Sequence, residues 1–118
     1  MTNADLQAVS DLTAEQLHLN LNPKVEVHEV QKGRVRPKTG KVTIPNWALS
    51  RGEPYVIAYV IHEVCHYKFM GHGQNFRTCE MSALKPWGLF PIYSRAYIKE
   101  LRQGSVNGPT LYKRPKRA

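Results

Sequence analysis

The 118-residue sequence has only two cysteines, Cys65 and Cys79, which are too few for a disulfide scaffold. We interpret both as reduced thiols in the core of a cytoplasmic protein. No apolar run approaches the roughly 18 residues of a membrane-spanning helix, because the longest, Tyr55 to Ile61, has seven. The first ten residues lack a basic region followed by an apolar one, so we expect no secretory signal and no membrane partner.

Acidic residues are scarce as well. The chain has 9 Asp and Glu against 17 Lys and Arg, a formal net charge of +8. The basic residues concentrate between Lys32 and Arg51 and in the terminal stretch 113–117. Such a surface attracts polyanions by counterion release, so nucleic acid is a candidate partner through the basic surface and tail. No nucleic-acid-binding motif is recognisable, and a solvated basic surface is the alternative interpretation.

The spacing of apolar residues predicts a mixture of helices and short strands. Thr13 and Gln16 resemble a capping box that would open a second helical turn within the first helical region. Trp47 is expected in the core. The expected elements are one or two helices within residues 3–20, strands at 24–30, 33–36 and 41–44, a helical turn at 46–49, and helices beginning at Pro54, over 74–84 and over 91–101.

The most informative motif is His62-Glu63-Val64-Cys65-His66, within the apolar stretch that begins at Pro54. This stretch is β-branched enough to form a strand by propensity alone, but the ligand spacing favours a helix. Residues four apart lie on one helix face, so His62 and His66 can direct two imidazoles at one ion. Glu63 can reach a water on the metal without being a ligand, which is the chemistry of HExxH hydrolases.

His72 is the expected third ligand. A continuing helix would carry this residue off the metal face, but Gly71 lets the chain leave the helix, often through a left-handed residue, and turn back. Three of the five histidines lie within the eleven residues 62–72, which favours a metal site over a core helix with solvated histidines. Glu80 is the competing third ligand, because some zinc peptidases use a glutamate on a following helix.

The segment Tyr59 to His66, followed by His72, Gly73 and Phe76, resembles the SprT-like and YgjP-like small zinc metallopeptidases and, more loosely, the WLM peptidases. The similarity covers roughly residues 40–80. It implies Zn²⁺ ligands at His62, His66 and His72 and a general base at Glu63. SprT proper also carries a Cys-rich zinc ribbon after the protease core, and this sequence has none.

The resemblance also implies the architecture. We expect an α+β minigluzincin-like zincin core, with a short antiparallel sheet of about three strands packed on the central HExxH helix and flanking N- and C-terminal helices. Residues 1–104 would form this single domain, and 105–118 would be a basic, flexible tail. By the same resemblance, the strand 41–44 would pair with an extended substrate backbone, although a purely structural role for this strand is equally open.

The expected function is zinc-dependent hydrolysis of peptide bonds in a peptide or protein substrate, by Glu63-assisted attack of a zinc-bound water. Tyr93 and Tyr97 are candidate donors to the oxyanion that forms on the attacked carbonyl, with core or surface packing as their alternative. Two other functions remain open. One is a zinc-bearing, nucleic-acid-associated module with weak or no catalysis, and the other is a zinc amidase acting on a non-protein substrate.

Overall fold

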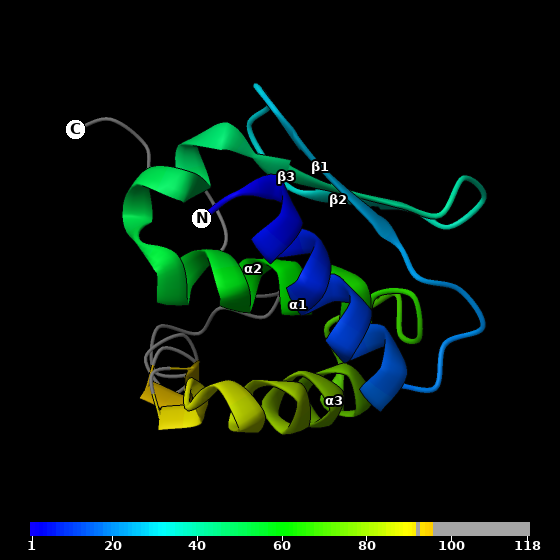
Figure 1. The fold of residues 1–118 in the computed structure, drawn as a ribbon. Coiled ribbons are helices and arrows are strands. Elements are labelled where there is room, and N and C mark those ends of the chain that lie inside the picture. The colour runs from blue at the N-terminus through cyan, green and yellow to red at the C-terminus, as the bar shows by residue number, and fades with distance from the viewer. Residues whose placement is uncertain (92, 96–118) are drawn as a thin grey trace.

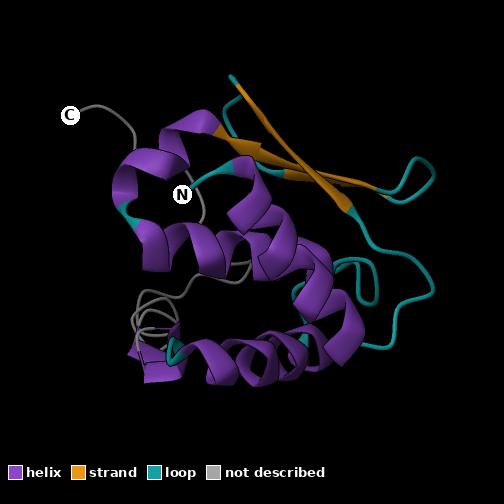
Figure 2. Cartoon of the chain, viewed as in Figure 1, coloured by secondary structure: helices purple, strands orange, loops and turns teal. Residues whose placement is uncertain are grey.

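The computed structural model describes residues 1–91 and 93–95 of the chain. Helices pack against one face of a small sheet, so the fold is α+β (Figures 1 and 2). The elements are α1 (Asn3–Gln16), β1 (Lys24–His28), β2 (Arg34–Arg36), β3 (Lys41–Pro45), the 3₁₀ turn η1 (Asn46–Arg51), α2 (Glu53–Cys65), α3 (Gln74–Leu84) and the 3₁₀ turn η2 (Lys85–Trp87).

The three-stranded sheet is mixed, with strand order β1-β3-β2. The turn before Lys41 makes β2 and β3 antiparallel, as expected, but β1 and β3 are parallel, so the expectation of a wholly antiparallel sheet is wrong for this pair. The physical reason is that β3 carries the fully buried Val42 and Ile44. After β1 the chain therefore first forms the edge strand β2. The most apolar strand, β3, then takes the central position between β1 and β2.

The central position of β3 also corrects the expected substrate-binding strand. Because β3 is hydrogen-bonded to a neighbour on each side, it has no free edge for an extended peptide. β2 bonds to β3 on one side only within the described sheet, so its other edge is open. Among the described strands, β1 likewise has no strand on its outer side, so an extended substrate backbone could pair with β1 or β2 but not with strand 41–44.

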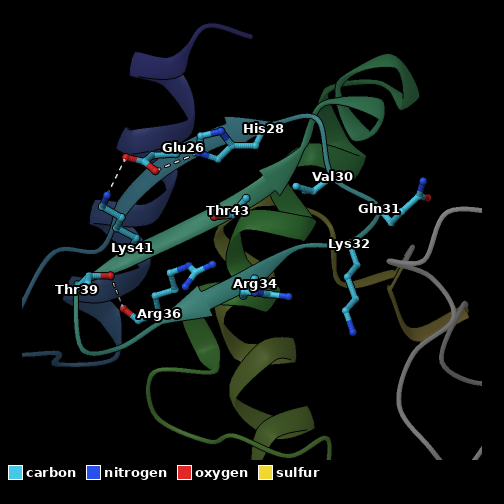
Figure 3. Close-up of a pocket in the computed structure, with 10 residues that line it drawn as sticks. All are labelled: Glu26, His28, Val30, Gln31, Lys32, Arg34, Arg36, Thr39, Lys41 and Thr43. Carbon is cyan, nitrogen blue, oxygen red and sulfur yellow. Dashed lines mark hydrogen bonds and ion pairs between the residues drawn. The ribbon is translucent and has the colours of Figure 1, made fainter.

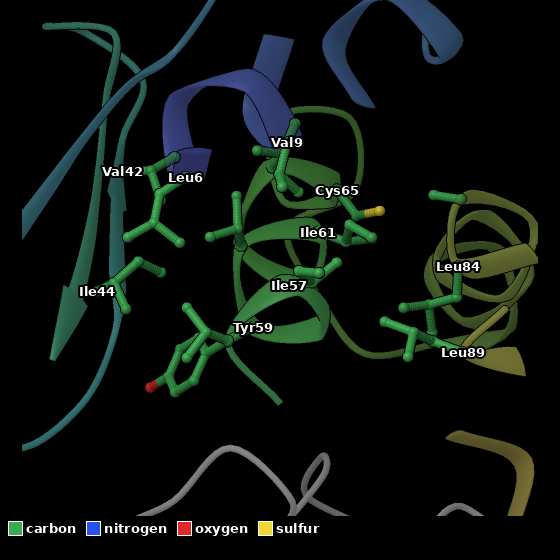
Figure 4. Close-up of a cluster of buried hydrophobic side chains, with 14 of the residues drawn as sticks. Leu6, Val9, Val42, Ile44, Ile57, Tyr59, Ile61, Cys65, Leu84 and Leu89 are labelled. Carbon is green, nitrogen blue, oxygen red and sulfur yellow. The ribbon is translucent and has the colours of Figure 1, made fainter. Parts of the chain in front are cut away.

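Helix α2 forms the centre of the core. Its apolar residues pack against the inner face of the sheet on one side and against α3 on the other, while α1 covers a third side (Figure 4). The Gly52 backbone, with φ 97°, makes the bend between η1 and α2, and Pro54 lies in the first turn of the helix. Each fully buried aliphatic side chain, such as Ile61 or Val64, contributes about 1.5–3 kcal/mol.

Helix α1 begins with a capping box at its true start. The Thr2 side chain accepts from the Asp5 backbone N–H, and the Asp5 carboxylate accepts from the Thr2 N–H. The capping box expected at Thr13 and Gln16 is wrong, because the Thr13 hydroxyl donates to the Val9 carbonyl within a continuous helix (2.8 Å). The apolar residues of α1 pack against α2, so the helix continues through Thr13 without a break.

The C-terminal expectations fall largely outside the described residues. Residues 90, 91 and 93–95 are helical, in agreement with the start of the helix expected over 91–101. The remainder of that helix and the tail 105–118 are not among the residues that the structure describes. Within the described residues, no helix combines the length and the apolar character needed to cross a membrane.

Candidate metal centre and active site

Two imidazoles project from one face of α2. His62 and His66 lie one helical turn apart, and their ring centroids are 4.9 Å apart. Both side chains are buried. Burial and the neighbouring His62 imidazole lower the pKa of His66. This histidine is therefore neutral at pH 7 and can offer a ring nitrogen to a cation.

The third imidazole arrives from the loop after α2. The His72 ring stacks on His62 at a centroid distance of 5.2 Å and meets His66 edge-on at 4.8 Å. One candidate ligand atom from each of the three histidines lies within 4.8 Å of the other two. Burial, and then the two neighbouring imidazoles, lower the pKa of His72 to about 4. The sequence-predicted set His62, His66 and His72 is thus brought together in space.

The way in which the chain leaves α2 differs from the expectation. The helix ends at Cys65, and the next backbone N–H groups, from His66 to Lys68, donate to carbonyls three residues back at 3.0–3.1 Å. This tightening into a 3₁₀-like turn ends the helix before Gly71. Gly71 has no left-handed φ, so the expected left-handed exit at this glycine is wrong.

The ring nitrogens on the far side of two imidazoles are already held. His62 Nδ1 contacts Glu80 Oε2, and His66 Nδ1 donates to the Phe69 carbonyl at 3.0 Å. With Nδ1 engaged in this way, Nε2 is the nitrogen of each ring that can bind a metal ion. Three imidazoles, two of them oriented through Nδ1, fit Zn²⁺, and such a site also accepts other divalent transition metals.

Glu80 is the functional residue whose role the sequence did not reveal. It was the competing third ligand, but the structure places it behind His62, fully buried, and the cluster of candidate ligand atoms does not include it. Its second oxygen lies 4.0 Å from Arg77 Nη1. A signal was present: Glu80 shares the helical spacing of Phe76 and Leu84, the apolar inner face of α3, where an unpaired carboxylate would be costly.

Glu63 lies beside the imidazole cluster with its carboxylate buried. Glu63 Oε1 is 4.0 Å from His62 Nε2, on the side of the ring that faces the cluster. Burial raises the pKa of the Glu63 carboxyl to about 7, and the His62 imidazole acts in the opposite direction. A carboxyl with a pKa in this range can both accept and return a proton near neutral pH.

The backbone of Gly33, directly before β2, closes over this carboxylate. A Cβ atom at this position would lie 2.5 Å from Tyr59 Cε1 and 3.1 Å from Glu63 Oε1, so only glycine fits without a shift. The Gly33 N–H donates to the Tyr59 hydroxyl at 2.7 Å. The sequence predicted Gly33 as the start of the strand 33–36 after a turn, but gave no sign of its contact with Tyr59 and Glu63. The contact shows that β2 begins beside the face of α2 that carries Glu63.

Of the two candidate oxyanion donors, Tyr93 and Tyr97, the structure describes Tyr93. Tyr93 is buried, and its hydroxyl accepts from Arg77 Nη1 at 2.9 Å. Burial and the Glu80 carboxylate raise the pKa of Tyr93, so the phenol keeps its proton at neutral pH. Its role as a donor to substrate stays a prediction. Tyr97 lies outside the described residues.

Comparison with known proteins agrees with this geometry. The model of the YgjP-like metallopeptidase domain matches residues 3–86, which include the three histidines, Glu63 and Glu80. The chain belongs to the YgjP-like metallopeptidase family. A search of curated proteins gave no match.

A solved structure shares the fold of this YgjP-like domain. The metallopeptidase zymogen of Pyrococcus abyssi abylysin superposes with a TM-score of 0.56 at 22% sequence identity, over 64% of this chain and 75% of that protein. At this identity the similarity concerns the fold alone. The small-metallopeptidase architecture inferred from the HExxH segment is therefore confirmed, including the helix that carries the motif.

Proposed function

We propose that this YgjP-like domain is a zinc-dependent peptidase, in which His62, His66 and His72 hold the ion and Glu63 is the general base. The observation that carries the proposal is the convergence of three imidazoles, with ligand atoms within 4.8 Å, beside a buried glutamate that is not part of the cluster. Bound zinc would supply Lewis acidity, making a nearby water more acidic and a carbonyl more electrophilic.

Glu63 performs the proton transfers. Its carboxylate takes a proton from the attacking water and later gives it to the nitrogen of the departing amine. Glu63 directly follows His62 on α2, so its carboxylate can face the reacting atoms while the histidines bind the metal ion. Burial of the carboxyl among protein groups excludes bulk water, so the proton stays with the reacting groups.

The free edge of β2 supplies the surface for the substrate backbone. An extended peptide paired with this edge would run past Gly33, whose backbone lies against Tyr59 and close to Glu63. Main-chain hydrogen bonds at a sheet edge hold a peptide without demanding one sequence. The pairing would bring one peptide bond to the Glu63 carboxylate.

The proposal is tested by Glu63→Gln, with Glu53→Gln as the matched control in the exposed first turn of the same helix. Each protein is loaded with zinc, its metal content is measured, and cleavage of a mixture of peptides is followed by mass spectrometry. Glu63→Gln should keep the metal and lose about 10²- to 10⁴-fold in turnover, while Glu53→Gln keeps both. Undiminished turnover in Glu63→Gln would refute the role of this residue.

The same assay separates the two alternative functions. Hydrolysis of small non-peptide amides without any cleavage of peptides would identify an amidase with the same metal chemistry. A metal-loaded wild type that hydrolyses neither kind of substrate, yet binds nucleic acid in a salt-sensitive way, would favour the zinc-bearing binding module.

A further inference from the structure

We propose that the substrates of this peptidase carry acidic side chains, which Arg34 and Arg36 bind on the outer face of β2. The inference rests on the proposed peptidase function and names the class of substrate for that site. It depends on three observations: the direction in which the two arginines point, their lack of acidic partners, and the distance between β2 and Glu63.

The register of the sheet places both arginines on the face away from α2. Val35 is opposite the fully buried Val42, so these two side chains face the core. Since side chains alternate along a strand, Arg34 and Arg36 face outward, as the close-up shows (Figure 3). Both are exposed, and they lie on a strand with a free edge.

The guanidinium groups are available for a ligand. Neither Arg34 nor Arg36 forms an ion pair with any residue that the structure describes. Glu26, the acidic side chain at this face, is already shared between Lys41 Nζ at 3.6 Å and His28 Nε2 at 3.1 Å. The outer face of β2 therefore keeps an uncompensated positive charge, and Arg binds carboxylates with a two-pronged geometry.

A hollow accompanies this charge. A cavity of about 580 Å³ opens on the outer face of the sheet, and its lining includes Lys32, Arg34, Arg36, Thr39, Lys41 and Thr43. Charged and hydroxyl groups dominate the lining, which includes the His28 imidazole but no Phe, Tyr or Trp side chain. Such a cavity suits a carboxylate side chain, whereas single-stranded nucleic acid is held mainly by bases stacked on aromatic rings.

The strand connects this cavity to the reacting groups. Gly33, next to Arg34 in the chain, lies over Glu63, and Arg36 is about 10 Å farther along the strand. A peptide paired with the free edge of β2 would place every second side chain on the outer face, beside the arginines. Acidic residues two positions apart, within a few residues of the cleaved bond, would therefore be preferred.

The test compares three peptides that share one cleavable core and differ at two alternating positions, which carry Asp, Asn or Lys. For the zinc-loaded wild type at low salt, kcat/KM should be roughly two- to thirty-fold higher for the Asp than for the Asn peptide. The preference should shrink at high salt. Arg34→Glu and Arg36→Glu should each reduce or reverse it, while Lys38→Glu, the same charge change outside the cavity lining, should keep it.

Equal cleavage of the Asp and Asn peptides, or a preference that survives both arginine variants, would overturn the proposal. Fluorescence anisotropy with the Glu63→Gln variant measures binding independently of cleavage. Preferential binding of the Asp peptide without turnover in the wild type would support the cavity and refute the peptidase assignment. Stronger displacement of the Asp peptide by an oligonucleotide of equal charge, lost in Arg34→Glu, would identify a nucleic-acid surface and overturn the acidic-peptide assignment.

Discussion

The carboxylate of Glu80 on α3 contacts Nδ1 of His62 on α2, so these two helices meet through a buried hydrogen bond beside the imidazole cluster. The contact orients the imidazole and leaves Nε2 toward the His66 and His72 rings. It also gives the buried Glu80 carboxyl group a hydrogen-bond partner on an otherwise apolar helix face. We therefore expect metal binding at His62 to be coupled to the packing of α3.

Glu80→Gln should weaken zinc binding, because an amide cannot stabilise the protonated Nδ1 of His62 as a carboxylate does. Loss of such a supporting partner typically lowers metal affinity or activity by about 10- to 100-fold. Affinity is measured by competition with a chromogenic chelator. Glu15→Gln, at an exposed position of α1, is the control and should bind zinc as the wild type does. Equal affinity in both variants would remove Glu80 from the site.

His72→Ala should remove the third ligand and sharply reduce the metal content. The wild type should carry about one zinc per chain after loading and removal of free metal. His28→Ala replaces an exposed histidine that does not belong to the cluster and should leave the content unchanged. The measurement is plasma mass spectrometry on all three proteins. Full zinc content in His72→Ala would place the third ligand elsewhere.

Gly33→Ala should lower both stability and turnover. The added Cβ would lie 2.5 Å from Tyr59 Cε1, so the ring or the start of β2 must move, at a cost of about 1–3 kcal/mol in the free energy of unfolding. Gly71→Ala is the matched control, since no atom lies within 4 Å of its added Cβ. Urea unfolding of the two variants checks the difference, and equal stability would show that the contact at Gly33 is readily relaxed.

The two thiols should differ in their reactivity. Cys65 is fully buried in α2, whereas Cys79 on α3 is partly exposed, and their Sγ atoms are 3.6 Å apart. In the native protein, iodoacetamide should label Cys79 and leave Cys65 unmodified until the protein is unfolded. Peptide mapping by mass spectrometry locates the label. A native Cys79→Ser variant should take up none, and rapid labelling of Cys65 would show that the core opens locally.

Local pattern was sufficient for most of the helices and for the clustering of the three imidazoles. His62 and His66 are one turn apart, so helical geometry alone puts them on one face of α2. The bounds of α3 matched the expectation at Gln74–Leu84. The way in which α2 ends was predicted less well. The tight turn after Cys65 depends on backbone hydrogen bonds, which the presence of a glycine at position 71 does not predict.

The sequence by itself determined the HExxH helix, the His72 ligand candidate and the α+β class, because each follows from spacing within a short stretch of chain. Only the tertiary structure decided the order of the strands, the closure of Gly33 over Glu63 and the support of His62 by Glu80. These relationships join segments distant in the chain, such as those of His62 and Glu80, which are 18 positions apart. They depend on which apolar faces are buried together, and that choice is made by the packing of the whole core around α2.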